Sequence, residues 1–118
     1  MNKTFGWHLI LDCSKGDISR TKDKEYIEKW IKNLVSEIDM IPFGHPQVFH
    51  FGDGELAGFT ALQFITTSNI LCHFMDDTGN FYLDVFSCKE FDVDIVIKNI
   101  QENFNPVSVR ERFITRNA

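Results

Sequence analysis

Apolar residues recur every three or four positions in two stretches of the chain, a spacing typical of amphipathic helices. The first stretch, residues 22–40, has charged residues on its other face, and the proline-containing segment 41–46 ends it. The second stretch, residues 92–104, ends before Asn105-Pro106. The positions expected to face the core are Tyr26, Ile27, Trp30, Ile31, Leu34, Val35, Ile38, Val93, Val96, Ile97, Ile100 and Phe104.

Six other segments are short, rich in apolar and aromatic residues, and bounded by turn residues, which predicts strands. They are residues 5–13, 47–51, 58–67, 70–76, 81–87 and 107–114. The order β-α-β-β-β-β-α-β predicts an α+β fold, a two-layer sandwich with a mainly antiparallel sheet and two helices on one face. We expect one domain over residues 1–118. We also expect a homodimer, because no third helix is available to cover the other face of the sheet.

Composition and charge argue against several classes of protein. Twelve Lys and Arg against 17 Asp and Glu give a net charge of −5, which disfavours a nucleic-acid partner. The apolar runs are far shorter than the ~20 residues of a membrane span, and no signal-peptide pattern opens the chain. We therefore expect a soluble, cytoplasmic protein with no membrane partner. The three cysteines form no C-x-x-C pair, which argues against a disulfide framework and a zinc site.

The segment Asp77-Thr78-Gly79-Asn80 predicts a hairpin turn between the fourth and fifth strands. With the turn centred on Thr78-Gly79, His73 faces Asp84 across the hairpin, and Asn69 faces Cys88. Because side chains alternate along a strand, one face of the sheet holds His73, Asp84, Phe86 and Cys88, with Ser68 at the strand entrance and Cys72 on the opposite face.

Spacing alone leaves three interpretations of this cluster open. One is structural: His73 is a core histidine bonded to Asp84, and Cys88 is a buried thiol. A Ser-His-Asp triad is the second, although no nucleophile-elbow signature surrounds Ser68. The third is a metal site, but its possible ligands lack a recognised spacing, so we expect no metal. These possible ligands are His8, Asp12, His50 and His73.

Ser68, His73 and Cys88 are five and then fifteen residues apart, in the segment GFTALQFITTSNILCHFMDDTGNFYLDVFSC that runs from Gly58 to Cys88. This segment resembles the core of the prokaryotic S-adenosylmethionine decarboxylases. The serine, the histidine five residues on and the cysteine twenty residues on match that family without a gap. Further matches are Gly79, Asp84, Phe86 and the opening FGWHLILD, residues 5–12, which is similar to the family's L-G-x-H-L-x-x-E start.

The resemblance implies an enzyme that makes its own cofactor. In the family the serine hydroxyl attacks the preceding carbonyl and the resulting ester eliminates, which here would cut the chain between Thr67 and Ser68. Ser68 would become a pyruvoyl group, which forms a Schiff base with the amine of a small-molecule substrate and accepts electrons during decarboxylation. By the same resemblance, Cys88 donates the proton that replaces CO₂, and His73 and Thr60 assist processing.

Several positions depart from the family pattern. Thr67 stands where the family usually has Glu, Met75 replaces an aromatic residue, and Asp77 replaces a longer acid that holds the ribose hydroxyls. Either Phe49 or Phe51 matches the aromatic residue that stacks on adenine. Three functions remain open: decarboxylation of S-adenosylmethionine for polyamine and spermidine synthesis, the same chemistry on ornithine or arginine, and an unprocessed binding or regulatory relative.

The expected hairpin places His73 four residues from Asn69, the partner of Cys88, which is about 13 Å at the rise of a strand. His73 and Cys88 of one chain therefore cannot both contact one pyruvoyl group. We expect a homodimer with two composite active sites, because a second chain can supply the missing residues. Each site would combine Ser68 and Cys88 of one chain with Thr60, His73 and Asp77 of the other.

Overall fold

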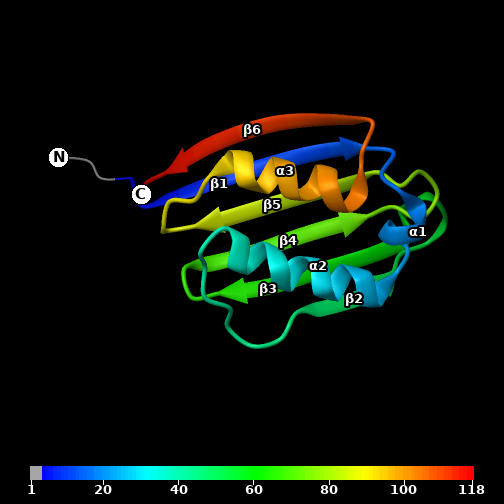
Figure 1. Ribbon diagram of the computed structural model, residues 1–118, viewed down its shortest axis with the longest axis horizontal. Helices are drawn as coiled ribbons and strands as arrows, with labels where there is room; N and C mark the ends of the chain where they lie inside the picture. Colours follow the sequence, from blue (N-terminus) through cyan, green and yellow to red (C-terminus); the bar gives the residue numbers. More distant parts are fainter. Residues whose placement is uncertain (1–3) are drawn as a thin grey trace.

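One antiparallel sheet of six strands forms the frame of the computed structural model, which describes residues 4–118. From edge to edge the strand order is β2-β3-β4-β5-β1-β6 (Figure 1). The strands are β1 (Gly6–Ser14), β2 (Gln47–Phe51), β3 (Gly58–Ile65), β4 (Ser68–Phe74), β5 (Phe81–Ser87) and β6 (Ser108–Arg116). Each strand is antiparallel to its neighbours, which confirms the expected kind of sheet.

Two long helices, α2 (Lys24–Glu37) and α3 (Val93–Phe104), accompany a short helix α1 (Ile18–Thr21) and a 3₁₀ turn η1 (Gly54–Leu56). The expectation of one helix over residues 22–40 is wrong at both ends. Asp23 accepts a hydrogen bond from the Tyr26 N–H and so caps a helix that begins at Lys24. Asp39, with a left-handed φ of 58°, follows its end. Among residues 4–118, no helix is both long and apolar enough to cross a membrane.

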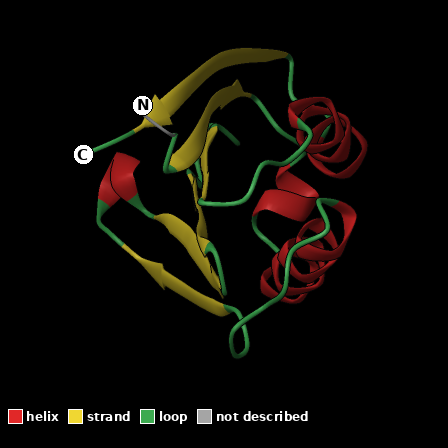
Figure 2. Cartoon of the chain, turned by 90° about the vertical axis from the view of Figure 1, so that its left-hand side faces the viewer, coloured by secondary structure: helices red, strands yellow, loops and turns green. Residues whose placement is uncertain are grey.

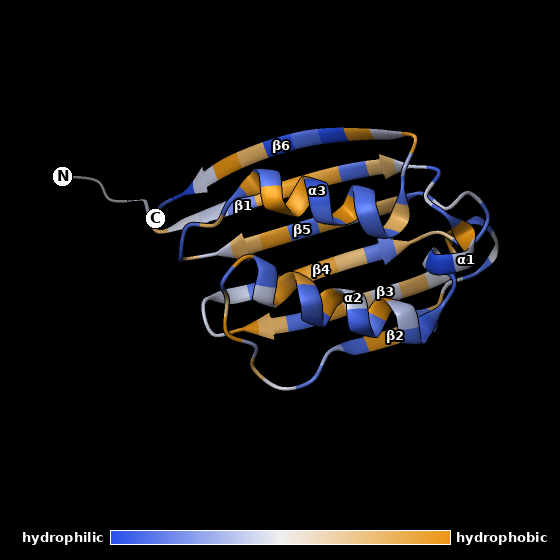
Figure 3. Ribbon diagram, in the orientation of Figure 1, coloured by the Kyte–Doolittle hydropathy of each residue, from blue (hydrophilic) through white to orange (hydrophobic). Residues whose placement is uncertain are grey.

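Helices α2 and α3 lie side by side on one face of the sheet, which confirms the α+β sandwich (Figure 2). Figure 3 shows hydrophobic and hydrophilic residues alternating along both helices, as amphipathic packing requires. Between the layers, four aromatic rings pack with centroids 5.0–5.8 Å apart: Trp30, Phe74, Phe81 and Phe104. These rings join the helices to β5 and to β4, the strand that carries Ser68 and His73.

The opposite face of the sheet, here called the open face, keeps several large apolar side chains exposed. Phe49 and Phe51 of β2, Phe64 of β3 and Ile114 of β6 are each between 44% and 61% exposed. Alternation along the strands places all four on the side away from α2 and α3. Apolar groups gathered on one face are typical of a surface that another chain or a ligand covers.

The pairing of β4 with β5 differs by two residues from the expected one. His73 lies opposite Tyr82, and Ser68 lies opposite Ser87, so the expected pairs His73–Asp84 and Asn69–Cys88 are wrong. A shift of two residues is one full side-chain repeat and leaves the faces unchanged. His73 thus shares the open face with Asp84 and Phe86, as expected, while Cys72 is fully buried beneath the helices.

The position of Gly79 in the turn explains this shift. The Gly79 N–H donates to the Met75 carbonyl oxygen at 3.0 Å, which closes a longer loop than a two-residue turn. Gly79 therefore occupies the end of the loop, where its φ is 75°. A Cβ there would lie 2.4 Å from the carbonyl oxygen of Gly16, so a glycine is required.

Candidate active site

The bond before Ser68 lies in a tight hairpin between β3 and β4. Ile65 pairs with Ser68, which leaves Thr66 and Thr67 as the connecting residues. The φ angle of Ser68 is 154°, in a region that residues other than glycine rarely adopt. Such a backbone costs about 1–3 kcal/mol and persists only where surrounding contacts hold it. The peptide between Thr67 and Ser68 is therefore strained on its C-terminal side.

The carbonyl of Thr67 is held from β5. Its oxygen accepts a hydrogen bond of 2.9 Å from the backbone N–H of Cys88. This bond extends the β4–β5 ladder by one position, so it orients the carbonyl firmly. An N–H aimed at a carbonyl oxygen also stabilises negative charge that develops there when the carbon is attacked.

The thiol of Cys88 is exposed, whereas those of Cys13 and Cys72 are buried. The interpretation of Cys88 as a buried thiol is therefore wrong. Burial, reinforced by the nearby Asp12, raises the pKa of the Cys13 thiol to about 12. Burial also raises the pKa of Cys72 well above its ordinary value. Of the three thiols, only that of Cys88 is accessible to solvent and to dissolved reagents.

Alkylation should distinguish these thiols. Iodoacetamide at pH 8 should add one label per folded chain, at Cys88, because the other thiols are buried and protonated. Intact-mass spectrometry before and after unfolding measures the count, and peptide mapping gives the position. All three cysteines should react in denaturant. Rapid labelling of Cys13 or Cys72 in the native protein would contradict this assignment.

Thr60 and His73 form a second centre on the open face. Thr60 Oγ1 and His73 Nδ1 are 3.1 Å apart across the β3–β4 pair, in hydrogen-bonding contact. The alternative in which His73 bonds to Asp84 is wrong, because the register places these residues apart. Along β4, His73 is five residues from Ser68, about 16 Å at the rise of a strand. The Thr60–His73 pair and the Ser68 bond thus lie near opposite ends of the same strand.

The remaining candidates of the metal hypothesis are dispersed. Nε2 of His8 lies 3.0 Å from Oδ1 of Asp84, and Nε2 of His50 lies 2.7 Å from Oδ2 of Asp76. His73 has Thr60 as its partner, so the histidines take part in separate pairs. Among residues 4–118, no three His, Cys, Asp or Glu side chains gather as a metal site would require.

Met75 and Asp77 border a cavity of about 420 Å³ at the His73 end of the sheet. Its lining residues are Glu55, Leu56, Met75, Asp77, Thr78, Asn80 and Tyr82. The expected aromatic residues Phe49 and Phe51 are 61% and 59% exposed on β2, and Phe49 pairs with Thr60. The structure thus places the residues expected to bind substrate near the Thr60–His73 pair and away from Ser68.

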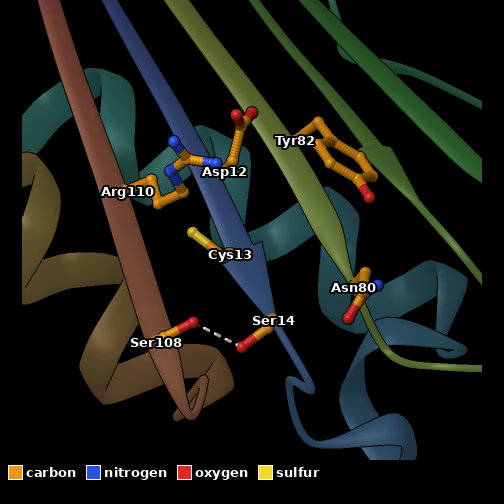
Figure 4. Close-up of a pocket in the computed structure, with 7 residues that line it drawn as sticks. All are labelled: Asp12, Cys13, Ser14, Asn80, Tyr82, Ser108 and Arg110. Atoms are coloured by element: carbon orange, nitrogen blue, oxygen red, sulfur yellow. Dashed lines mark hydrogen bonds between the residues drawn. The ribbon is translucent and has the colours of Figure 1, made fainter.

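A row of polar side chains continues from His73 across the open face. Tyr82 of β5 pairs with His73 on one side and with Asp12 of β1 on the other, and Asp12 pairs with Arg110 of β6. Asp12, Tyr82 and Arg110 line a cavity of about 240 Å³. Figure 4 shows these side chains, with the hydrogen bond between Ser14 and Ser108 below them. The row adds ionisable groups to the face that bears His73.

Comparison with known proteins identifies the family. A family model described as S-adenosylmethionine decarboxylase matches residues 7–117. The chain belongs to the S-adenosylmethionine decarboxylase family. Two similar relatives are S-adenosylmethionine decarboxylase proenzymes of Clostridium botulinum, from strain Hall at 26% identity and from strain Loch Maree at 24%. Each alignment spans 112 residues, 92% of this chain and 93% of the relative.

The fold agrees with this family membership. The crystal structure of the adenosylmethionine decarboxylase from Aquifex aeolicus VF5 matches with a TM-score of 0.83 at 20% identity. The match covers 99% of this chain and 94% of that one. At this level of identity, the likeness is one of fold.

Two residues of this S-adenosylmethionine decarboxylase family member were not found by sequence reasoning. Tyr82 became a candidate functional residue only because the observed strand register places it opposite His73. Ser87 is fully buried, and its hydroxyl contacts Thr67 next to the strained bond. The sequence feature that could have singled out Ser87 is its position directly before Cys88. It is a polar residue at the end of a strand whose alternate positions face the core.

Proposed function

We propose that this chain cuts itself between Thr67 and Ser68 and then decarboxylates S-adenosylmethionine. The observation that carries the proposal is the Thr67–Ser68 peptide, where Ser68 has a φ of 154° and the Thr67 carbonyl accepts the Cys88 N–H. The named activity of the curated relatives, and their designation as proenzymes, support it. So does the exposed thiol of Cys88, the residue whose backbone N–H contacts the same bond.

The cut begins with attack of Ser68 Oγ on the carbonyl carbon of Thr67. The new C–O bond replaces the C–N bond, and the hydroxyl proton passes to the nitrogen, which leaves an ester. During the attack, the Cys88 N–H stabilises the negative charge on the Thr67 oxygen. Loss of the Ser68 Cα proton then expels Thr67 as a carboxylate. Water replaces the nitrogen, which leaves as ammonia, and a ketone remains at position 68.

A pyruvoyl group at position 68 would supply an electrophilic ketone for the substrate amine and a sink for the electron pair that stays on the substrate carbon when CO₂ leaves. Cys88 is the proposed donor of the proton that then returns to carbon, because its thiol is exposed and its backbone N–H contacts the residue before position 68. Phe49, Phe51 and the cavity beside Met75 and Asp77 would hold the nucleoside part of the substrate. The product would supply aminopropyl groups for polyamine synthesis.

A second copy of the chain is part of this proposal. Ser68 and His73 are about 16 Å apart along β4, too far for both side chains to contact one pyruvoyl group within a protomer. Two open faces packed about a two-fold axis would bring the Ser68 end of one sheet to the His73 end of the other. Each active site would then use Ser68 and Cys88 of one chain with Thr60, His73 and Asp77 of its partner.

Intact-mass spectrometry of the freshly purified protein tests the cut. We expect two fragments, residues 1–67 and 68–118, in place of one chain of 13.7 kDa. Ser68→Ala lacks the attacking hydroxyl and should stay intact, whereas Ser36→Ala, at an exposed helix position, should be cut normally. CO₂ release should be faster from S-adenosylmethionine than from ornithine or arginine. A wild-type chain that stays whole would refute the proposal.

A further inference from the structure

Three segments far apart in the sequence meet at the side chain of Thr67. The Ser87 hydroxyl lies 2.8 Å from Thr67 Oγ1, and Thr67 Oγ1 lies 3.4 Å from the Met40 sulfur. The Lys89 N–H donates to Ser87 Oγ at 3.0 Å. Residues that follow α2 and residues that end β5 therefore both contact the turn that precedes Ser68.

Ser87 Oγ lies between a group that can only donate, the Lys89 N–H, and a thioether sulfur that can only accept. The Met40 sulfur lies 3.4 Å from Thr67 Oγ1 and 3.7 Å from Ser87 Oγ, so either hydroxyl can donate to it. In both arrangements the two hydroxyls share a hydrogen bond of 2.8 Å, the shortest contact of the group. The Thr67 side chain is therefore held by Ser87.

Further hydrogen bonds hold Lys89 and Met40, the residues at the two ends of this hydrogen-bond chain. The Lys89 ammonium donates to the backbone carbonyl of Asp39 at 2.6 Å and lies 3.1 Å from its carboxylate. Met40 directly follows Asp39, and its N–H donates to the Val35 carbonyl of α2 at 2.9 Å. Ser87 is fully buried, so water does not compete for its hydroxyl.

We propose that Ser87 is a positioning residue for the cut, which it aids by holding Thr67; this inference rests on the proposed function. Thr67 supplies the carbonyl that Ser68 attacks, and the Cys88 N–H fixes that carbonyl from one side. The bond from Ser87 fixes the same residue through its side chain. The rate of attack depends steeply on the alignment of the reacting atoms. Loss of either hydrogen bond to Thr67 should therefore slow the attack of Ser68 on the Thr67 carbonyl. Thr67 and Ser87 thus form a pair of bonded hydroxyl groups at the position where the family pattern usually has glutamate.

Time courses of cutting in freshly translated chains test this role. Ser87→Ala should be cut at least ten-fold more slowly than the wild type, on the scale that lost alignment produces. Ser87→Thr keeps the hydroxyl and should restore much of the rate. Thr67→Val removes the same bond from a half-buried position and should slow cutting as much, whereas Thr67→Ser should not. Ser87→Ala combined with Thr67→Val should be no slower than either alone, because both remove one interaction.

Two readouts separate positioning from loss of stability. Chains of Ser87→Ala that have been cut should turn over substrate at the wild-type kcat, since Ser87 does not contact the substrate. The uncut chains should resist hydroxylamine, which cleaves esters, because the delayed step precedes the ester. Ile100→Val, which trims a buried residue of α3, should lower the melting temperature without slowing the cut.

The outcomes distinguish this inference from the proposed function. Slow cutting of Ser87→Ala and Thr67→Val, with normal cutting of Ile100→Val, supports the role of Ser87. If the wild type is cut and both hydroxyl variants match its rate, Ser87 has no such role and the proposed function stands. Equal slowing in Ile100→Val would assign the effect to stability and overturn the inference. A wild-type chain that is never cut overturns both.

Discussion

Chains carrying His73→Ala and chains carrying Cys88→Ala should restore each other's activity when they assemble into one dimer. His73→Ala alone should stay uncut, because the proposed site takes its histidine from the partner chain and neither chain has one. Cys88→Ala alone should be cut but should turn over slowly. In a mixed dimer, the His73→Ala chain supplies Ser68 and Cys88 while the other chain supplies Thr60 and His73. One of the two sites is then complete.

The measurement combines mass spectrometry with CO₂ release from co-expressed, differently tagged chains. The His73→Ala chain should be cut only when the Cys88→Ala chain accompanies it. Random pairing of equal amounts should give about a quarter of the wild-type activity, because half of the dimers are mixed and each has one complete site.

A second mixture provides the control. Ser68→Ala and Cys88→Ala place both defects on the same side of the composite site, so no arrangement of these chains gives a complete one. Their mixture should stay as inactive as the separate variants. Activity in this control, or none in the His73→Ala and Cys88→Ala mixture of confirmed heterodimers, would contradict the composite site.

Local signals predicted several elements to within a residue. Residues 47–51 and 81–87 alternate or cluster apolar side chains between clear turn residues, and both are strands with those bounds. The helix expected over residues 92–104 begins one residue later, since Asp92 is its cap. The periodicity over residues 22–40 predicted the helix bounds wrongly, because the apolar spacing continues past the residues that cap and end α2. Hydrophobic spacing identifies a buried face more accurately than it locates a helix end.

The hairpin register shows where sequence reasoning reaches its limit. Gly79 suggested the centre of a two-residue turn, but the longer loop depends on the close approach of Gly79 to Gly16. That contact joins segments more than sixty residues apart, and no local pattern records it. The predicted register differed from the observed one by two residues, an even number. The prediction that His73 and Asp84 share a face was therefore still correct.

The candidate site was accessible to sequence reasoning only in part. The spacing of Ser68, His73 and Cys88 pointed to the family that the family model also matches, whereas the exposure of Cys88 became known only from the structure. The contact between Ser87 and Thr67 was missed because it depends on the observed register, which places Ser87 opposite Ser68. Contacts between distant segments need the tertiary structure.

Replacing the thiol of Cys88 should separate the cut from turnover. Cys88→Ala keeps the backbone N–H that contacts the Thr67 carbonyl, so the chain should still be cut before Ser68. The variant lacks the proposed proton donor, and turnover should fall by about 10² or more, the usual effect of removing a positioned acid. Because Cys88 is exposed, the substitution leaves the core unchanged.

The measurement pairs the extent of cutting, from intact masses, with kcat for CO₂ release by the cut protein. Cys72→Ala is the matched control, because Cys72 lies on β4 but faces the helices. It should keep the wild-type kcat even if its melting temperature falls. A kcat of Cys88→Ala equal to the wild type would remove the thiol from the reaction. Failure of Cys88→Ala to be cut would show that the side chain, and not only the N–H, acts in the first step.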